Sequence, residues 1–176
     1  MANFQDASSF QVHDDYYTQR STWEMITPFI PEGKTIWEMC LLNSNEQSKK
    51  YLSELLPTCQ IIGNKTVNCL DENPYIDIVD IIITNPPFET EIKKKVLRKL
   101  VELKKPFIII LNALNIFSKY YHDIFKDTDI KYIIPSRKIH YDKYKEGGEE
   151  LIESKKNTSF NSIFVTYGIV DKNIHL

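Results

Sequence analysis

Apolar and polar positions alternate along this chain in two patterns, which predict strands and helices in turn. Residues 75–84 (YIDIVDIIIT) and 106–111 (PFIIIL) are apolar, largely β-branched runs, typical of strands buried on both faces. Between them, residues 91–104 repeat apolar positions at the spacing of an amphipathic helix. The inner stripe of that helix would consist of Ile92, Val96, Leu100 and Leu103.

Shorter stretches extend the alternation to both sides. Because strands and helices follow one another, the pattern predicts an α/β fold with a mostly parallel, doubly wound sheet and helices on both faces. The further elements expected are a short helix within 16–30 that begins near Ser21 or Thr22, helices over 45–56 and 115–126, and strands over 34–39, 59–64, 129–135 and 161–170.

Length and charge fit one soluble domain. The chain has 176 residues, and we expect a polar arm over 1–14 followed by a single domain over 15–176. The formal net charge of -2 is not that of a basic nucleic-acid binder, so contact with nucleic acid would need a local basic patch or a partner. The N-terminus lacks the pattern of a signal peptide, so a cytoplasmic location is expected.

Cysteine and histidine spacing argues against metal binding. The three cysteines are scattered and form no C-x-x-C pair, and the four histidines also lack the spacing of metal ligands. We therefore expect neither a metal site nor a disulfide framework, which is consistent with a reducing compartment.

A proline pair stands at the end of the strand predicted over 75–84, in the sequence Asn85-Pro86-Pro87-Phe88. Proline fixes its own φ and restricts the residue before it, so the pair forms a short rigid loop. The loop is either a stiff turn or a device that holds Asn85 and Phe88 for a ligand. In parallel sheets ligands bind outside the carboxyl ends of the strands, and Glu38 ends an earlier strand at the same edge.

Together these features resemble the S-adenosylmethionine-dependent amino-methyltransferases, above all the adenine-N6 DNA methyltransferases of phages and large DNA viruses. The strings DDYYTQRSTWEMI, TIWEM, KPFIIIL and SRKIHYDKY are also similar to that family, so the resemblance covers most of residues 14–168. It implies a Rossmann-like class I methyltransferase fold with an antiparallel last strand. It also implies S-adenosyl-L-methionine as the cofactor and adenine in DNA as the substrate.

The same resemblance assigns roles to the rigid loop. The Asn85 side chain and the Pro86 carbonyl would accept hydrogen bonds from the adenine amine, Pro87 would keep the loop rigid, and Phe88 would stack on a base rotated out of the duplex. Related loops occur in RNA and protein amine methyltransferases, which remain an alternative. Residues implied to bind the cofactor are Tyr17, Thr18, Glu38, Asn64 and Asp71.

The stretch after Glu38 departs from the family. A glycine-rich cofactor loop is expected there, yet no glycine occurs between Gly33 and Gly63, and Leu41 and Leu42 add bulk. Two interpretations stay open. The cofactor binds through a variant loop, or the chain is a catalytically silent subunit that supports a homo- or hetero-oligomeric partner.

Two segments of the chain, 93–99 and 136–160, are rich in basic residues. The lysines and arginine at 93–99 are best explained as a solvated helix face. Residues 136–160 are expected to form a long polar loop that contacts the substrate. Its candidate substrate-binding residues are Arg137, Lys138, His140 and Tyr141. Asn112 is expected to cap the helix that follows it.

Overall fold

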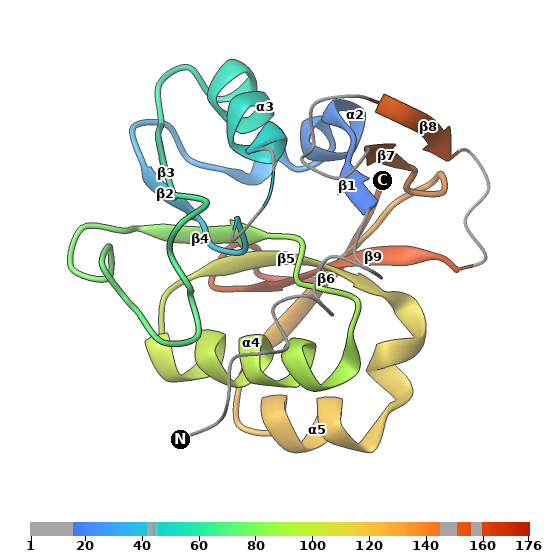
Figure 1. Cartoon of the computed structure of the whole chain (residues 1–176). Helices are drawn as coiled ribbons and strands as arrows, with labels where there is room; N and C mark the ends of the chain where they lie inside the picture. The colour runs from blue at the N-terminus through green and yellow to red at the C-terminus, as the bar shows by residue number, and fades with distance from the viewer. Residues whose placement is uncertain (1–15, 42–43, 45, 145–150, 156–159) are drawn as a thin grey trace.

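The computed structural model describes residues 16–41, 44, 46–144, 151–155 and 160–176, so the arm expected over 1–14 lies outside the described residues. Figure 1 shows a central sheet with helices on both faces and a small second sheet beside it. The central sheet contains β2 (Thr35–Glu38), β3 (Gln60–Ile62), β4 (Ile81–Thr84), β5 (Phe107–Asn112), β6 (Ile130–Ile134), β9 (Ser162–Tyr167) and β10 (Ile174–His175). The small sheet contains β1 (Tyr16–Thr18), β7 (Tyr141–Tyr144) and β8 (Leu151–Lys155). The helices are α2 (Arg20–Glu24), η2 (Thr27–Phe29), α3 (Gln47–Leu55), α4 (Thr90–Leu103), η3 (Ala113–Phe117) and α5 (Lys119–Phe125).

The strand order of the central sheet is β10-β6-β9-β5-β4-β2-β3. The pairs β2–β3, β2–β4, β4–β5 and β6–β10 are parallel, whereas β9 runs antiparallel to both of its neighbours. The expected doubly wound, mostly parallel sheet is confirmed. The antiparallel strand is not the last one, however, because β10 follows β9 in the chain.

The pleat of β4 divides the core into two layers. Ile82 faces the layer formed with α4 and α5, which includes Val96 and Leu97. Ile81 and Ile83 face the opposite layer, which includes Trp23 and Leu52 from α2 and α3. All four residues of β4 are buried, as expected of a strand covered on both faces.

The strand expected over 75–84 is less than half as long as the pattern suggests. Only Ile81–Thr84 is extended, and the amides of Ile78 and Val79 instead bond back to the carbonyl of Tyr75 in helical turns. The prediction was wrong there because the Asn73-Pro74 step starts a compact turn, which leaves Ile78 exposed to solvent.

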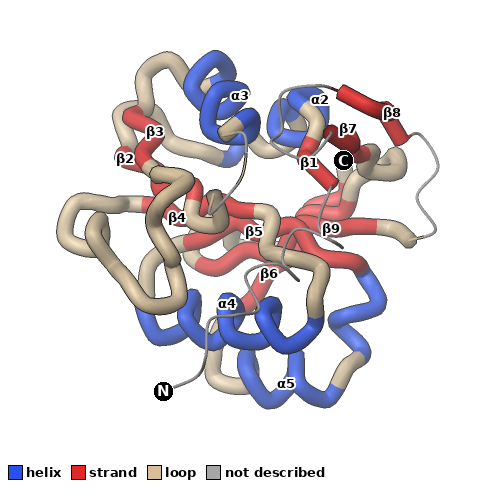
Figure 2. Tube along the Cα trace, viewed as in Figure 1, coloured by secondary structure: helices blue, strands red, loops and turns tan. Residues whose placement is uncertain are grey.

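Two further corrections share one cause. Residues 16–18, which precede the short helix predicted within 16–30, form a strand that was not predicted, and the long loop expected over 136–160 contains β7 and β8. Tyr16–Thr18 pairs with Tyr141–Lys143, more than a hundred residues away. Local patterns do not reveal such a partner, so the extended backbone was missed. Figure 2 shows these strands beside α2.

The segment expected as one helix over 115–126 is split into η3 and α5. Asn112 caps η3, since its side-chain oxygen accepts a hydrogen bond from the amide of Leu114 at 3.0 Å. In the part of the chain that the structure describes, no helix is long and apolar enough to cross a membrane, and no group of three or more His, Cys, Asp or Glu side chains could hold a metal ion.

Candidate active site

Most of the predicted site residues gather at one edge of the central sheet. The parallel strands β2 and β4 are neighbours, with Glu38 opposite Ile83, so the end of β2 lies beside the loop that follows β4. That loop carries Asn85, Pro86, Pro87 and Phe88. The carboxyl ends of parallel strands are where ligands bind in this type of sheet.

The loop after β4 combines two buried prolines with two partly exposed side chains. Pro86 and Pro87 are buried, whereas Asn85 and Phe88 are half-buried. The Asn85 side chain makes no hydrogen bond among the described residues, so its amide is available to a ligand. Buried prolines fix the backbone beneath the two flanking side chains, which is the arrangement that a preorganised site needs.

The Phe88 ring belongs to an aromatic cluster. It meets Tyr141 edge-on at a centroid distance of 5.7 Å and lies 5.4 Å from the ring of Phe160. The Tyr141 hydroxyl shares a hydrogen bond of 2.8 Å with Ser162 Oγ, and burial raises the pKa of Tyr141 to about 12. Neither Phe160 nor Ser162 was singled out from the sequence, because both reach the site through the β5–β9 pairing.

Lys93 anchors the same loop. Its side chain is only 8% exposed, and its Nζ donates a hydrogen bond of 3.1 Å to the carbonyl of Phe88. The prediction of a solvated face is therefore wrong for this lysine, although Lys95 and Arg98 on α4 are exposed. A buried ammonium is stable only when it is paired or hydrogen-bonded, so Lys93 ties α4 to the loop.

Glu38 is fully enclosed at the end of β2. Its Oε1 accepts a hydrogen bond of 2.7 Å from Thr84 Oγ1, which in turn accepts one of 3.0 Å from the backbone amide of Cys40. Burial raises the pKa of Glu38 from 4.5 to about 7, against the lowering effect of the Thr84 hydrogen bond. Glu38 therefore links β2 to the residue before Asn85.

Thr18 presents an unpaired polar atom near the Phe88 cluster. It is 2% exposed, and its hydroxyl has no hydrogen-bond partner in the described structure. Thr18 stands opposite Tyr141 in the β1–β7 pair, and opposite residues share a face of a sheet. The hydroxyl is thus on the face that Tyr141 turns toward Phe88. The buried Nδ1 of His140, next in the chain to Tyr141, also has no partner in the described part.

The other residues expected to bind a cofactor are more dispersed. Tyr17 packs edge-on against Tyr144 at 5.0 Å, on the other face of the small sheet from Thr18. Asn64 and Asp71 are exposed in the turn after β3. The Asn64 side chain accepts from the amide of Thr66 at 2.9 Å, and Asp71 accepts from the Asn68 side chain at 2.7 Å.

That turn lies against the end of β2. The Sγ atoms of Cys40 and Cys69 are 3.9 Å apart, which brings the segment containing Asn64 and Asp71 close to Glu38. The cofactor half of the predicted site is thus assembled from β2 and β3. Whether these polar side chains bind a cofactor remains a prediction.

The residues expected to contact the substrate follow β6. Arg137 is exposed, Lys138 and His140 are half-buried, and Tyr141 is 0% exposed. Tyr141 therefore lies beneath Phe88, with no surface of its own to offer a substrate. Arg137 keeps the position at the sheet edge that the prediction requires.

The side chain of Leu41 is packed against Gly63 at the end of β2 and does not project into solvent. Leu41 is 2% exposed, and a Cβ added to Gly63 would lie 2.8 Å from its Cδ1 and 2.5 Å from the Glu38 carbonyl oxygen. Gly63 has a φ of +145°, so it allows β3 to pass tightly over the end of β2. Leu42 lies outside the described residues.

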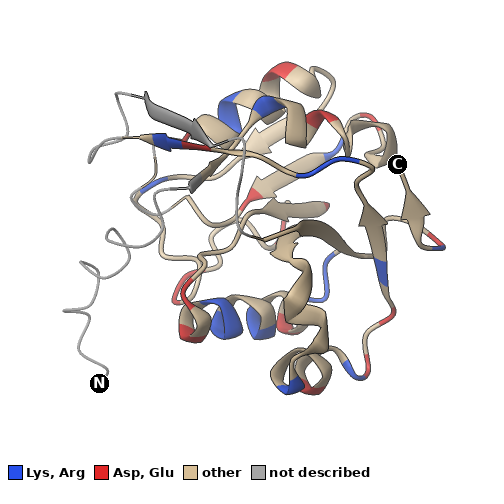
Figure 3. Cartoon of the chain, turned by 90° about the vertical axis from the view of Figure 1, so that its right-hand side faces the viewer, with Lys and Arg blue, Asp and Glu red and all other residues tan. Residues whose placement is uncertain are grey.

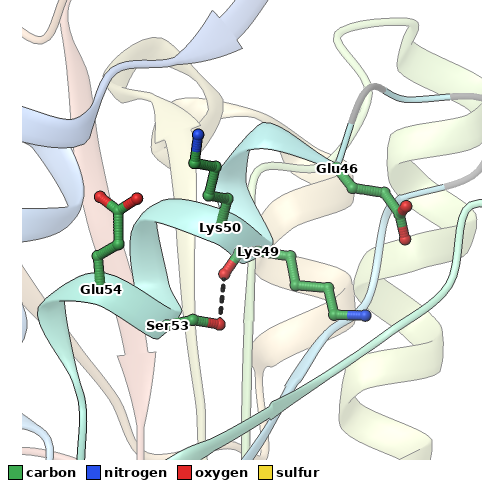
Figure 4. A pocket seen from close by; sticks show the side chains of 5 residues that line it. All are labelled: Glu46, Lys49, Lys50, Ser53 and Glu54. Atoms are coloured by element: carbon green, nitrogen blue, oxygen red, sulfur yellow. Dashed lines mark hydrogen bonds between the residues drawn. The ribbon is translucent and has the colours of Figure 1, made fainter.

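A hollow of about 480 Å³ opens along α3, lined by Glu46, Lys49, Lys50, Ser53 and Glu54 (Figure 4). None of these residues was predicted to be functional. Lys49 connects the hollow to the site, because its Nζ donates a hydrogen bond of 2.8 Å to the carbonyl of Gly63. The chemistry that the sequence predicts lies at the sheet edge instead, where the loops after β2 and β4 meet.

Comparison with known proteins supports the fold. No protein-family model and no curated protein matches the sequence. A solved structure assigned as a class I S-adenosylmethionine-dependent methyltransferase of Listeria monocytogenes aligns with a TM-score of 0.53 and 9% identity, covering 94% of this chain and 66% of that one. The fold is that of the class I methyltransferases. At this identity the likeness concerns the fold alone.

Other solved structures align less closely. An O-methyltransferase of Thermotoga maritima gives a TM-score of 0.40 at 14% identity, covering 84% of this chain and 64% of that one. An rRNA methylase of Clostridium thermocellum gives 0.42 at 15% identity, covering 89% and 98%. The chain thus spans slightly less than two thirds of the Thermotoga and Listeria proteins.

Proposed function

We propose that this protein is an S-adenosylmethionine-dependent methyltransferase that acts on the N6 amine of adenine in DNA. The observation that carries the proposal is the loop after β4, in which buried Pro86 and Pro87 hold a half-exposed Asn85 amide without a hydrogen-bond partner among the described residues. An aromatic side chain, Phe88, ends the same loop. The loop follows the carboxyl end of β4, and ligands bind at this end of the strands in parallel sheets, which supports the proposal.

The residues present fit such a cofactor at two points. The buried Thr18 hydroxyl lacks a partner in the described structure and lies on the face turned toward Phe88, so a polar group of a ligand there would satisfy it. The burial of Leu41 removes one of the two side chains that the sequence placed in the cofactor's way. When bound, S-adenosylmethionine supplies an electrophilic methyl carbon carried by a sulfonium.

The chain itself supplies orientation and hydrogen-bond acceptors. The exocyclic amine of adenine is a weak nucleophile, because its lone pair is delocalised into the ring. The side-chain oxygen of Asn85 and the carbonyl of Pro86 would accept its two N–H groups and favour attack through the lone pair. When the new N–C bond forms, the bond from the methyl carbon to sulfur would break and leave a neutral thioether. The amine, then cationic, would release a proton to solvent, so no strong general base is needed. Phe88 would contact the face of the extruded base.

The test is methyl transfer from labelled S-adenosylmethionine to a panel of DNA, RNA and protein, followed by identification of the modified atom. We expect N6-methyladenine in DNA, and we expect Asn85→Ala to remove transfer while the unfolding midpoint stays close to wild type. Full activity of Asn85→Ala would refute the mechanism. Methylation of RNA or of a protein amide, in place of DNA, would show that the proposed substrate is wrong. If the purified protein binds no S-adenosylmethionine, it is instead a catalytically silent subunit of a larger enzyme.

A further inference from the structure

Two large apolar side chains project into solvent from the turn after β5. Leu114 is 71% exposed and Phe117 is 76% exposed, more than any other large apolar side chain in the described part of the chain. Both belong to η3, a 3-10 helix with about three residues per turn, so side chains three positions apart lie on the same side. They therefore form one small apolar patch, named here the β5 patch.

Hydrogen bonds hold the β5 patch in place. The Asn115 side chain donates to the carbonyl of Asn112 at 2.7 Å, and Ser118 Oγ donates to the carbonyl of Asn115 at 2.6 Å. The Tyr120 hydroxyl also bonds to the Asn115 side chain. The turn is thus built to present Leu114 and Phe117 rather than to fold them inward. A rigid apolar surface binds a partner at a lower entropic cost than a mobile one.

The β5 patch lies between two parts of the predicted substrate site. β5 pairs with β4, which precedes the Asn85 loop, and with β9, which in turn pairs with β6. Arg137, exposed in the segment after β6, lies on the far side of the patch. Figure 1 shows the turn after β5 on the same side of the molecule as the loop after β4, and Figure 3 views the molecule from that side with its charged residues coloured.

We propose that Leu114 and Phe117 contact the bases of DNA next to the methylation target. This inference rests on the proposed function, and it adds a substrate contact that the sequence pattern did not indicate. Two side chains are too few for a stable protein interface, which buries about 800 Å² on each partner. A single exposed ring suits the flat face of a base, and apolar side chains inserted at base steps serve as wedges. Arg137, exposed in the segment after β6 at the same edge of the sheet, offers a cation to a phosphate backbone.

The experiment is fluorescence anisotropy with a labelled, adenine-containing DNA and no cofactor. We expect Phe117→Ala to weaken binding about tenfold or more, because stacking on an aromatic side chain typically contributes that much to affinity. Phe117→Trp should bind like the wild type. Ile78→Ala is the matched control, because Ile78 is also an exposed apolar residue, at 60%, but precedes β4 at the opposite edge of the sheet. The affinity of this variant for DNA should equal that of the wild type.

Several results would overturn this inference. The inference fails if Phe117→Ala binds DNA as tightly as the wild type does. It also fails if Phe117→Trp binds as weakly as Phe117→Ala, or if the wild type does not bind DNA. A Phe117-dependent preference for RNA of the same sequence, or a dimer in solution that Phe117→Ala dissolves, would assign the β5 patch to another partner.

Failure of the inference is distinguishable from failure of the proposed function. If the wild type methylates DNA but Phe117→Ala binds it normally, only the inference fails. If binding depends on Phe117 but no methyl is transferred, only the proposed function fails. Asn85→Ala should lose transfer and keep DNA binding.

Discussion

Glu38 offers a test that needs no knowledge of the substrate. Its carboxyl group is 2% exposed and accepts a hydrogen bond from Thr84 Oγ1. Replacing it by glutamine keeps the size of the side chain and an oxygen that can accept the same hydrogen bond. The substitution removes the capacity to ionise and replaces the second carboxyl oxygen by an amide NH2 group, a change that is the same at every pH. Comparison of Glu38→Gln with wild type therefore isolates the cost of a buried negative charge.

The size and sign of the effect follow from the pKa. Burial raises the pKa of Glu38 from 4.5 to about 7 in the folded protein. In the unfolded chain the proton is lost near the ordinary value, so between these pH values the folded state binds more protons than the unfolded state. The free energy of unfolding of wild type must then fall as pH rises through this window. At about 1.4 kcal/mol for each pH unit, the loss is about 3 kcal/mol.

The assay is urea-induced unfolding of wild type and Glu38→Gln at a series of pH values from 4 to 8. Other titrating groups contribute equally to both proteins, so the difference in unfolding free energy reports Glu38 alone. We expect that difference to shift by about 3 kcal/mol in favour of the variant between pH 4.5 and 7 and to level off above. A difference independent of pH, or one that shifts in favour of wild type as pH rises, would refute the reasoning.

Two further substitutions test the packing around the site. Gly63→Ala should lower the free energy of unfolding by about 2 kcal/mol or more, because its Cβ would lie 2.5 Å from a backbone carbonyl oxygen; Gly33→Ala, with nothing within 4 Å of its Cβ, should cost only about 1 kcal/mol. Equal losses in urea unfolding would contradict this account. Lys93→Met should lower kcat about tenfold without changing KM for DNA, since the Phe88 carbonyl loses a charged donor, whereas exposed Lys95→Met should leave kcat unchanged. A wild-type kcat in the Lys93 variant would rule out a positioning role.

The central architecture could be predicted from the sequence because its determinants are local. A run such as Ile81–Ile83 favours a strand covered on both faces, and the apolar spacing of α4 predicts a helix that buries one side. The alternation of such segments dictates parallel strands joined by helices. The position of Asn85 at a strand end follows from the same pattern, since the prolines stop the strand whatever surrounds it.

What only the tertiary structure decided are the contacts between distant segments. The pairing of Tyr16–Thr18 with Tyr141–Lys143 made a sheet from a segment that precedes a predicted helix and from a predicted loop. It also buried Tyr141 under Phe88 and left the Thr18 hydroxyl unpaired within the described structure. The burial of Lys93 likewise could not be predicted from the sequence pattern. A lysine in a polar helix pattern is normally solvated, and only the position of the loop carbonyl explains its burial. Periodicity records which face of an element is apolar, but the free energy of a non-local pair depends on a partner that periodicity does not specify.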